Sequence, residues 1–569
     1  MTKLITYLNY NPVDDGSLIP YFWLSMKAYV QDNYPESLWQ YTKPLGYQDK
    51  VLEEIEKNAP NVVLASLYVW NYDETMKILS EIKNIVPGVL IIVGGPHQLY
   101  KSEPGWFKTH NQIDLVCKED GYGEVFFSEL LKTLDKGTSI TEIPFCVYPT
   151  EDRLEYRISS TTFNKLDFKW PVNIFKRFKE EVLGKTVLFL ECSRGCPYKC
   201  VFCEWGGGTG SKVSFKPTTS ILEDLEYLFK ECDIEYIINT DANFGIIKRD
   251  LEIVQYIVKN SNATLDILGP SKTNPKILYQ IFELLLAQEN HSEYKMSIQD
   301  LDPEVNRNIK RKDLSVDEHL ALFKGISSEA RLELILGLPG ATLDKLFDVH
   351  DFIVKHGLAS YDRYLWVLLP TAPAYEKEYR EEFKLGYENF NTIEEGFQFS
   401  PIEGAIDFKS NPSPIVTSSY SYTREDWITM YRCDILFMSW TFNGFMSKLF
   451  RNKDIRASVL AKDIYFDFLP NHLEGLQGEL AKELLKHEGP NIEVVDLSNT
   501  ELKINIHMRS LATLIVMLNP TYFFAQLGVW AQKYKSVEIL EICASMPNLI
   551  EEPTGLGGNM TDPYSNLLK

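Results

Sequence analysis

The sequence predicts an α/β protein with an N-terminal doubly wound sheet, a central partial barrel of six β/α units and a mostly helical C-terminal domain. Three observations predict this class. Short apolar strands alternate with amphipathic helices in the first part of the chain. A second series of strand–helix repeats follows, and the pattern from Arg424 onward is mostly helical. We therefore expect domains at residues 1–140, 186–375 and 376–569, with a linker at residues 141–185.

Length and composition set the first bounds. The chain has 569 residues, which is more than a single hydrophobic core supports. Apolar residues make up 44% and charged residues 24%, as in an ordinary globular protein. The net charge of −21 argues against nucleic acid or an anionic membrane surface as a partner. The N-terminal residues lack the cationic start and apolar core of a signal peptide, so we expect a cytoplasmic protein.

The first domain is built from four predicted strands with helices between them. The strands are residues 3–9, 61–70, 89–95 and 113–117, and the clearest helices are residues 48–57 and 73–86. Parallel sheets of this kind bind ligands in the crevice beyond the carboxyl ends of their strands. We therefore examine the loops at those ends for binding residues.

These loops carry glycines, aromatic residues and a few polar side chains. Glycine lets the backbone approach a bulky ligand closely, although plain tight turns would also use it. Trp70 has a ring large enough to cover one face of a ligand, with core packing as the alternative. The candidate binding residues of this domain are Ser66, Tyr68, Trp70, Asn71, Gly94, Gly95, Pro96, His97, Gly121, Gly123 and Glu124.

The central repeats begin after a helix at residues 126–134 and a polar, aromatic-rich segment at residues 144–171. A strand at residues 186–191 leads directly into a cysteine-rich loop, at the end of a strand where a β/α barrel places its chemistry. A helix at residues 221–232 follows. The later strands are predicted at residues 234–239, 263–268, 294–299, 331–340 and 364–369.

The cysteine loop is the strongest chemical signal. Cys196, Cys200 and Cys203 have the spacing Cys-x3-Cys-x2-Cys, and four of the nine cysteines lie between Cys192 and Cys203. Three thiolates on one loop can hold three corners of an iron–sulfur cube, leaving one iron without a protein ligand. The spacing is not that of a tetrahedral zinc site, and a chance cluster of buried thiols is the other alternative. We expect a structural role for Cys192, and Arg194 could hold the cluster's charge or position a neighbouring loop.

Together with Gly94-Gly95-Pro96 and the element Gly121-Tyr122-Gly123-Glu124, this motif resembles the cobalamin-dependent radical S-adenosylmethionine (SAM) enzymes. The second element matches the family's usual Gly-Glu-Gly-Glu only in part. In that family the open iron binds the amino and carboxylate groups of SAM, and an electron from the cluster cleaves a carbon–sulfur bond. The strings at residues 203–208 and 240–250 are most similar to the branch containing tryptophan 2-C-methyltransferase. The resemblance covers roughly residues 1–375.

The resemblance implies further positions that hold SAM. Asp241 and Asn243 take the place of the segment that meets the methionine amino group, with helix capping as the alternative for Asp241. Gln299 and Glu333 would meet the ribose and carboxylate, unless they make ordinary structural hydrogen bonds. Lys272 would neutralise the SAM carboxylate, or would be a solvated bystander.

The implied cofactors are a [4Fe-4S] cluster, SAM and cobalamin. No histidine precedes His97, so the resemblance implies that a lower-face histidine ligand to cobalt is absent or comes from elsewhere. These cofactors are the equipment for moving a SAM-derived methyl group, via methylcobalamin, to an unactivated carbon of a small molecule, amino acid or peptide, possibly tryptophan or indole. The alternatives are cyclisation, ring contraction or oxidation without methyl transfer, and a non-catalytic iron–sulfur redox protein. We expect an electron donor such as flavodoxin or ferredoxin as a partner.

Residues 376–569 match no motif. A helical cap that carries substrate specificity is our prediction, and a stabilising or dimerising appendage is the alternative. Residues 510–532 carry no charge, and Asn519-Pro520 breaks the run. This pattern predicts two buried helices rather than a membrane span.

Overall fold

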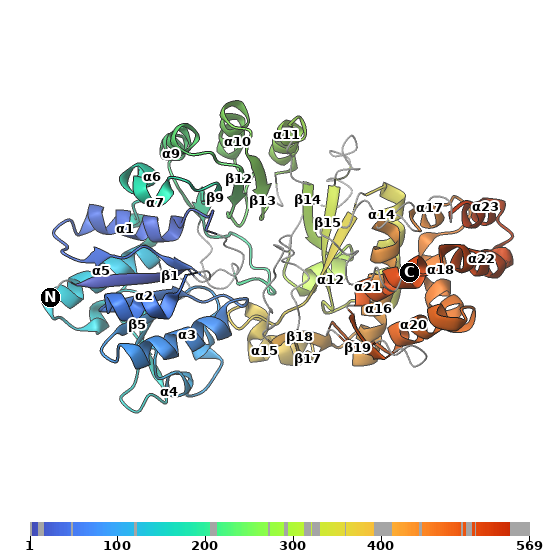
Figure 1. The fold of residues 1–569 in the computed structure, drawn as a ribbon, viewed down its shortest axis with the longest axis horizontal. Helices are drawn as coiled ribbons and strands as arrows, with labels where there is room; N and C mark the ends of the chain where they lie inside the picture. Colours follow the sequence, from blue (N-terminus) through green and yellow to red (C-terminus); the bar gives the residue numbers. More distant parts are fainter. Residues whose placement is uncertain are drawn as a thin grey trace. The chain divides into compact units, whose positions relative to one another are not determined.

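The structure of the protein is a computed structural model (Figure 1). It describes residues 3–9, 16–46, 49–118, 122–204, 213–270, 274–288, 294–311, 320, 330–358, 360–391, 412–442, 446–490, 493–496, 503–506 and 508–546. The chain divides into two compact units. The first contains Met1–Glu293, Lys310–Leu314 and Leu369–Glu376, and the second contains the remaining residues.

The first unit begins with the predicted doubly wound sheet. Its strand order is β2-β1-β4-β5-β6-β7-β8, and β3 also pairs with β1. The pairings from β2 to β6 are parallel, whereas β7 and β8 add an antiparallel edge. The strands are β1 Leu4–Asn9, β2 Gln40–Tyr41, β3 Leu45–Gly46, β4 Val62–Ser66, β5 Leu90–Gly94, β6 Leu115–Cys117, β7 Cys146–Pro149 and β8 Tyr156–Ile158. All four predicted strands of this domain are confirmed.

Helices α1 (Tyr21–Asn33) and α5 (Gly123–Lys136) pack together on the sheet. Trp23 of α1 stacks on Tyr7 of β1 with ring centroids 5.4 Å apart, and it lies 6.0 Å from Phe127 of α5. The sequence analysis did not predict α1. Its residues from Tyr21 to Val30 are buried almost without interruption, so no amphipathic period marks it.

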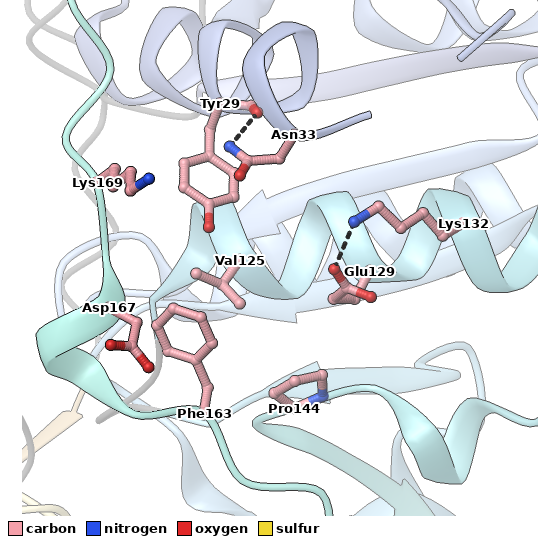
Figure 2. A pocket seen from close by; sticks show the side chains of 9 residues that line it. All are labelled: Tyr29, Asn33, Val125, Glu129, Lys132, Pro144, Phe163, Asp167 and Lys169. Carbon is pink, nitrogen blue, oxygen red and sulfur yellow. Dashed lines mark hydrogen bonds and ion pairs between the residues drawn. The ribbon is translucent and has the colours of Figure 1, made fainter. Parts of the chain in front are cut away.

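A pocket of about 630 Å³ opens beside these two helices (Figure 2). Its charged residues are of both signs, and Lys132 donates to Glu129 at 2.8 Å across its wall. Its wall comes from α1, α5 and the linker that follows them. The lining residues are Tyr29, Asn33, Val125, Glu129, Lys132, Pro144, Phe163, Asp167 and Lys169. None of them was predicted as a binding residue.

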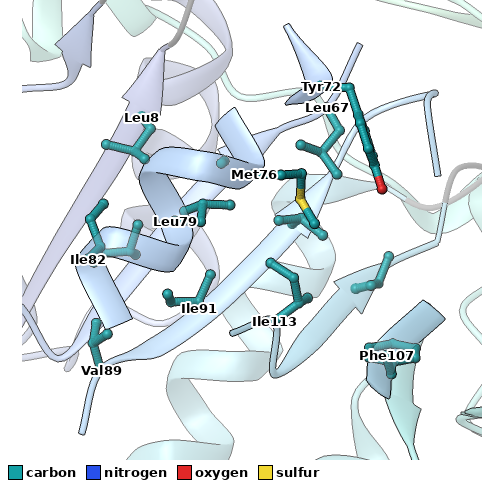
Figure 3. Close-up of a cluster of buried hydrophobic side chains, with 14 of the residues drawn as sticks. Leu8, Leu67, Tyr72, Met76, Leu79, Ile82, Val89, Ile91, Phe107 and Ile113 are labelled. Atoms are coloured by element: carbon teal, nitrogen blue, oxygen red, sulfur yellow. The ribbon is translucent and has the colours of Figure 1, made fainter. Parts of the chain in front are cut away.

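Helices α2 (Val51–Asn58) and α3 (Tyr72–Ile85) belong to a separate hydrophobic core against β1, β4 and β5. Figure 3 shows Met76, Leu79 and Ile82 of α3 turned toward strand residues such as Ile91. The short helix α4 (Trp106–Thr109) adds Phe107 to this core. This burial holds the carboxyl ends of β4 and β5 in fixed positions.

A second parallel sheet in the first unit has the order β13-β12-β9. It consists of β9 Val187–Leu190, β12 Tyr236–Asn239 and β13 Thr264–Ile267. Helices α9 (Thr218–Glu231), α10 (Lys248–Asn260) and α11 (Pro275–Leu286) follow one another along it (Figure 1). A small antiparallel pair, β10 Ser193–Arg194 and β11 Ser214–Phe215, continues from β9, and the linker forms α6 (Ile174–Arg177) and α7 (Lys179–Val182).

The second unit contains the other three predicted barrel strands as a parallel sheet, β14-β15-β16. These are β14 Tyr294–Gln299, β15 Ala330–Leu336 and β16 Ser360–Leu365, with helices α12 (Pro303–Asn308) and α14 (Leu343–His356). The predicted position of the last strand, residues 364–369, was wrong by several residues. The Trp366 amide still donates to Leu336 of β15 at 3.3 Å, but Val416 donates to the Trp366 carbonyl and Leu368 donates to Pro414, so the chain passes from β15 to a different hairpin.

That hairpin and a helical region complete the second unit. The hairpin pairs β17 Gly386–Asn391 with β18 Pro412–Ser418, and a second one pairs β19 Glu493–Asp496 with β20 Lys503–Ile506. The helices are α15 Lys377–Glu382, α16 Arg424–Phe442, α17 Ser447–Phe450, α18 Ala457–Asp463, α19 Leu469–Asn471, α20 Gly475–Lys486, α21 Met508–Met517, α22 Pro520–Ala531 and α23 Val537–Ser545. The mostly helical prediction for this region is confirmed.

The uncharged stretch near residue 520 forms the predicted helix pair, α21 and α22. Most of its apolar side chains, including Ile515 and Phe523, are buried. Within the described ranges no single helix is long and apolar enough to cross a membrane. This pair passes that test only when its two helices are taken together, and they are bent by 91°.

A buried charged cluster joins three elements of the second unit. Asp434 of α16 accepts hydrogen bonds from Arg363 Nε at 3.2 Å and from Tyr361 at 3.0 Å, both on β16. His350 of α14 lies 3.3 Å from the same carboxylate. Because the carboxylate is paired on several sides, its burial is compensated and the helix is fixed to the sheet.

Candidate cofactor-binding site

The three cysteines of the motif lie on the loop that leaves β9. Cys196 and Cys200 are buried and Cys203 is partly buried. All nine cysteines lie in described ranges, and none of them forms a disulfide. Among the described residues, no three His, Cys, Asp or Glu side chains are grouped as ligands of one metal ion. In an iron–sulfur cube each thiolate is attached to a different iron.

Asp241 fixes the start of this loop. It follows β12 and is only 2% exposed. One carboxylate oxygen accepts from the Cys192 amide at 2.7 Å, and the other accepts from the Ser193 hydroxyl at 2.6 Å. Burial raises the pKa of Asp241 to about 7, against the opposing effect of these hydrogen bonds. Asp241 therefore ties the end of β12 to the end of β9.

The capping role considered for Asp241 is wrong. Helix α10 is capped by Asp250, whose carboxylate accepts from the amides of Gly245 at 2.9 Å and Ile247 at 3.4 Å. Both amides lie before the first turn of the helix, where donors lack intrahelical partners.

Asn243 contacts the cysteine motif directly. Its side-chain nitrogen donates to Cys196 Sγ at 3.0 Å, and the residue is 5% exposed. The other end of the amide, Oδ1, is buried without a hydrogen-bond partner. A buried acceptor without a donor is costly, so this atom marks a place for a donor group.

Cys192 differs from the three motif cysteines. It is completely buried, and burial raises the pKa of its thiol well above the ordinary value. Its sulfur lies 3.9 Å from the Asn239 amide nitrogen, and its backbone carbonyl accepts from the Lys216 amide at 2.9 Å. These contacts agree with the structural role that we predict for it.

Arg194 connects the cysteine loop to the N-terminal sheet domain. Its guanidinium donates to both oxygens of Glu124, at 2.9 and 3.0 Å, and also to Glu191 at 2.8 Å. Ser25 of α1 donates to Glu124 at 2.9 Å. Glu124 is fully buried, which by itself raises its pKa, but Arg194 outweighs burial and the pKa is lowered.

Three aromatic rings surround the same guanidinium. Its central carbon lies 5.1 Å from the ring centre of Tyr122, 5.5 Å from that of Phe168 and 4.9 Å from that of Trp170. Such contacts favour a cation over the ring faces. Arg194 therefore has the second of the two roles considered for it, because its contacts position the cysteine loop against α5.

The loops after β4 and β5 pack closely on each other. Gly95 has φ +91°, and a Cβ there would lie 2.4 Å from the Leu67 carbonyl oxygen. The Leu67 amide donates to Gly94 at 2.8 Å, and the His97 amide donates back to Leu67 at 3.1 Å. Glycine is therefore required at position 95 by both conformation and space.

The other predicted residues of these loops have defined roles. Asn71 closes the turn: it accepts from the Tyr68 amide at 2.8 Å and donates to the Ser66 carbonyl at 3.0 Å. The Trp70 ring stacks on Tyr68 at 4.5 Å and is 40% exposed, so core packing is wrong for Trp70. The ring therefore lies at the surface of the loop, stacked on Tyr68.

Two buried polar atoms without a partner lie in the loop after β5. His97 Nδ1 and Gln98 Oε1 have no hydrogen-bond partner. Burial lowers the pKa of His97 to about 4, so its imidazole is neutral near pH 7. The Gln98 amide nitrogen donates to the carbonyls of Gly95 at 2.7 Å and Cys117 at 2.6 Å. The Gln98 amide nitrogen thus anchors the loop, while Gln98 Oε1 and His97 Nδ1 have no partner among the described residues.

A segment that the sequence analysis did not single out joins the two regions. The Thr371 hydroxyl lies 2.6 Å from Glu204 Oε1, next to the last motif cysteine, and 3.2 Å from the Pro96 carbonyl. The Ala374 amide donates to Val201 at 2.9 Å. The loop after β5 and the cysteine loop are therefore tied together within the first unit. The available signal was the string Pro370–Tyr375 directly after the last predicted strand.

The remaining predicted residues lie elsewhere. Gln299 and Glu333 are on the neighbouring strands β14 and β15 of the second unit. Gln299 is buried with φ +65°, an uncommon conformation that concentrates at functional positions. Glu333 accepts from Ser297 and from Tyr364, the latter at 3.3 Å, and burial raises its pKa. Gly121 and Lys272 lie outside the described residues.

Comparison with known proteins connects this arrangement to a group of enzymes. The chain is 28% identical over 391 residues to 2-(S-pantetheinyl)-carbapenam-3-carboxylate methyltransferase of Streptantibioticus cattleyicolor, covering 65% of the chain and 55% of the relative. It is 31% identical over 358 residues to the cobalamin-dependent radical SAM methyltransferase TokK of Streptomyces tokunonensis, covering 57% and 50%. The chain thus matches about half the length of these curated relatives. No family model matches it.

The fold comparison agrees. The radical SAM methyltransferase TsrM of Kitasatospora setae, solved with tryptophan substrate and a SAM analogue, superposes with a TM-score of 0.54 at 16% identity. The match covers 75% of this chain and 88% of TsrM. At this identity the likeness concerns the fold, and it confirms the predicted α/β class. The chain therefore resembles the cobalamin-dependent radical SAM enzymes in sequence and shares their fold.

Proposed function

We propose that the protein is a cobalamin-dependent radical SAM methyltransferase, which moves a SAM-derived methyl group to an unactivated carbon of a small molecule or amino acid. One observation carries this proposal. The loop with the three cysteines and the loop after β5 are joined through Thr371, and Arg194 joins the cysteine loop to α5. Two regions with different binding chemistry are therefore held next to each other.

The donor set fits a [4Fe-4S] cluster. Cys196, Cys200 and Cys203 would supply three thiolates from one loop, none of them is bound in a disulfide, and Asn243 already donates to one of the sulfurs. The partnerless Oδ1 of Asn243 fits a donor such as the amino group of SAM. Asp241 holds the loop in place, and both of its oxygens are engaged there.

The loops after β4 and β5 fit a flat, amide-rich ring such as that of cobalamin. Gly95 lets the two loops pack directly on each other, and the Trp70 ring is exposed. The buried, partnerless Gln98 Oε1 suits an amide N–H donor on the edge of such a ring, and His97 Nδ1 suits an amide N–H or C=O group according to its tautomer. When bound, these groups would supply one-electron chemistry and a carrier for methyl groups. The chain's own residues bind and orient them and exclude water from the cysteine loop.

The methyl acceptor that we propose is a small molecule. The chain is more similar in sequence to the carbapenam methyltransferase, at 28% identity, than to TsrM, at 16%. A β-lactam carrying a pantetheinyl thioether is therefore a candidate acceptor alongside tryptophan. A one-electron donor such as flavodoxin or ferredoxin would reduce the cluster.

The test is anaerobic reconstitution with iron, sulfide and cobalamin, followed by incubation with SAM, a reductant and each candidate acceptor. We expect S-adenosylhomocysteine, 5′-deoxyadenosine and an acceptor heavier by one CH2. Cys200→Ala should abolish cluster absorbance and SAM turnover, whereas Cys192→Ala, the matched control in the same loop, should keep both. An acceptor changed without gaining CH2 would favour cyclisation or oxidation. Protein that forms a cluster but binds neither SAM nor cobalamin would favour a redox carrier.

A further inference from the structure

We propose that Asn243 sets the reduction potential of the iron–sulfur cluster through its hydrogen bond to Cys196. This inference rests on the proposed function, because it requires a cluster on the cysteine loop. It adds a role for this chain's own residue that is distinct from binding SAM.

The contact is short and buried. Asn243 Nδ2 lies 3.0 Å from Cys196 Sγ, and the two residues are 5% and 7% exposed. Among the described residues, Oδ1 has no hydrogen-bond partner, so the side chain of Asn243 is held there by its hydrogen bond to Cys196 Sγ. Little solvent competes for this donor, so it acts at full strength on the thiolate.

The backbone fixes where the amide points. Asn243 follows Asp241, whose carboxylate is tied to Cys192 and Ser193. On its other side the Phe244 amide donates to the Gly269 carbonyl at 2.7 Å. A Cβ at Gly269 would lie 2.3 Å from the Asp241 carbonyl oxygen, so the loops after β12 and β13 are in tight contact. Asn243 is therefore held toward the cysteine loop from two sides.

The sign of the effect follows from charge. Reduction adds one negative charge to a cluster that already carries three thiolates. A hydrogen bond to a ligand sulfur stabilises the more negative, reduced state, and it thereby raises the reduction potential. Without that donor, reduction should become harder.

The measurement is an EPR-monitored redox titration of anaerobically reconstituted protein, without SAM or acceptor. We expect Asn243→Leu to lower the reduced-to-oxidised ratio at a given potential about tenfold, which corresponds to about 59 mV for one electron. Asn243→Asp, which keeps the size but replaces the donor by a carboxylate, should shift the potential in the same direction and further. If Asn243→Leu assembles no cluster, the potential of Asn243→Asp tests the inference in its place.

Asn239→Leu is the matched control. Asn239 is the buried last residue of β12, the strand that precedes Asn243, and its amide nitrogen lies 3.9 Å from the sulfur of Cys192, which is outside the three-cysteine motif. Its substitution should leave the potential unchanged. Equal potentials for wild type and both Asn243 variants, or an equal shift in Asn239→Leu, would overturn the inference. Wild-type protein that assembles no cluster would instead contradict the proposed function.

Discussion

Glu124 and Arg194 form a two-point ion pair between helix α5 and the cysteine loop, with N–O distances of 2.9 and 3.0 Å. Glu124 is fully buried and the Arg194 side chain is 15% exposed. The carboxylate comes from the first turn of α5, in the Gly121-Tyr122-Gly123-Glu124 element that the family resemblance assigned to cobalamin, and the guanidinium comes from the cysteine motif. This pair therefore connects the two predicted cofactor regions directly, in addition to the contacts of Thr371 with Pro96 and Glu204.

Replacing Arg194 by Met should destabilise the protein by about 3–5 kcal/mol. The substitution leaves Glu124 buried without its cation, and removing one partner of a buried pair costs energy of this size. Denaturant unfolding followed by circular dichroism measures the change. Glu53→Gln is the control, because the Lys50–Glu53 pair at 3.1 Å is exposed and should contribute no more than about 1 kcal/mol. Equal, small effects in both variants would refute the connecting role of Arg194.

Gly95→Ala should destabilise the N-terminal sheet domain by at least about 2 kcal/mol and weaken cobalamin binding. A side chain at φ +91° is strained, and its Cβ would collide with the Leu67 backbone. Thermal unfolding and cobalamin titration report the two effects. Gly88→Ala is the matched control: a Cβ there has no neighbour within 4 Å, so its effect should stay within about 1 kcal/mol of wild type. If Gly95→Ala is no more destabilising than Gly88→Ala, the predicted clash between residue 95 and the Leu67 backbone is refuted.

The stability of the protein should fall as the pH drops from 6.5 to 4, partly because of His97. Its pKa is lowered by burial from 6.5 to about 4, so the folded protein holds it neutral. Above pH 6.5 His97 is neutral in the folded and the unfolded protein, so its burial costs no stability through protonation. As the pH falls from 6.5 to 4, the unfolded chain binds a proton that the folded protein excludes, and the free energy of unfolding falls by up to about 3 kcal/mol for this group. His97→Gln should flatten the loss of melting temperature in this range, whereas His472→Gln, at a far more exposed histidine, should not. If His97→Gln has the same dependence of melting temperature on pH as the wild type, His97 does not cause this loss of stability.

The sequence predicted those features that local patterns determine. The strands that lead into the loops at Ser66, Gly94 and Cys192 were found because short apolar runs alternate with helices. The cysteine loop was found because three ligands of one cluster are close together in the chain. Asn243 was found only through a family pattern, since its contact with Cys196 joins residues 47 positions apart.

Contacts between segments that are far apart in the chain could not be predicted from the sequence. Helix α1 has apolar residues on all sides, so it lacks the period that marks a surface helix, and the Ser25–Glu124 hydrogen bond was missed with it. Thr371 bridges Pro96 and Glu204 across large separations in sequence. The last barrel strand was misplaced because residues 366–368 pair with β18, and no local pattern distinguishes one strand partner from another.

The central claim is that three thiolates of one loop hold a cube with one iron open to SAM. The direct measurement is low-temperature EPR of reduced, anaerobically reconstituted protein, recorded before and after addition of SAM alone. A [4Fe-4S] signal whose g-values change when SAM is added is the predicted result, together with loss of the signal in Cys196→Ala. A signal that is the same with and without SAM, or a cluster that survives in Cys196→Ala, would contradict the claim.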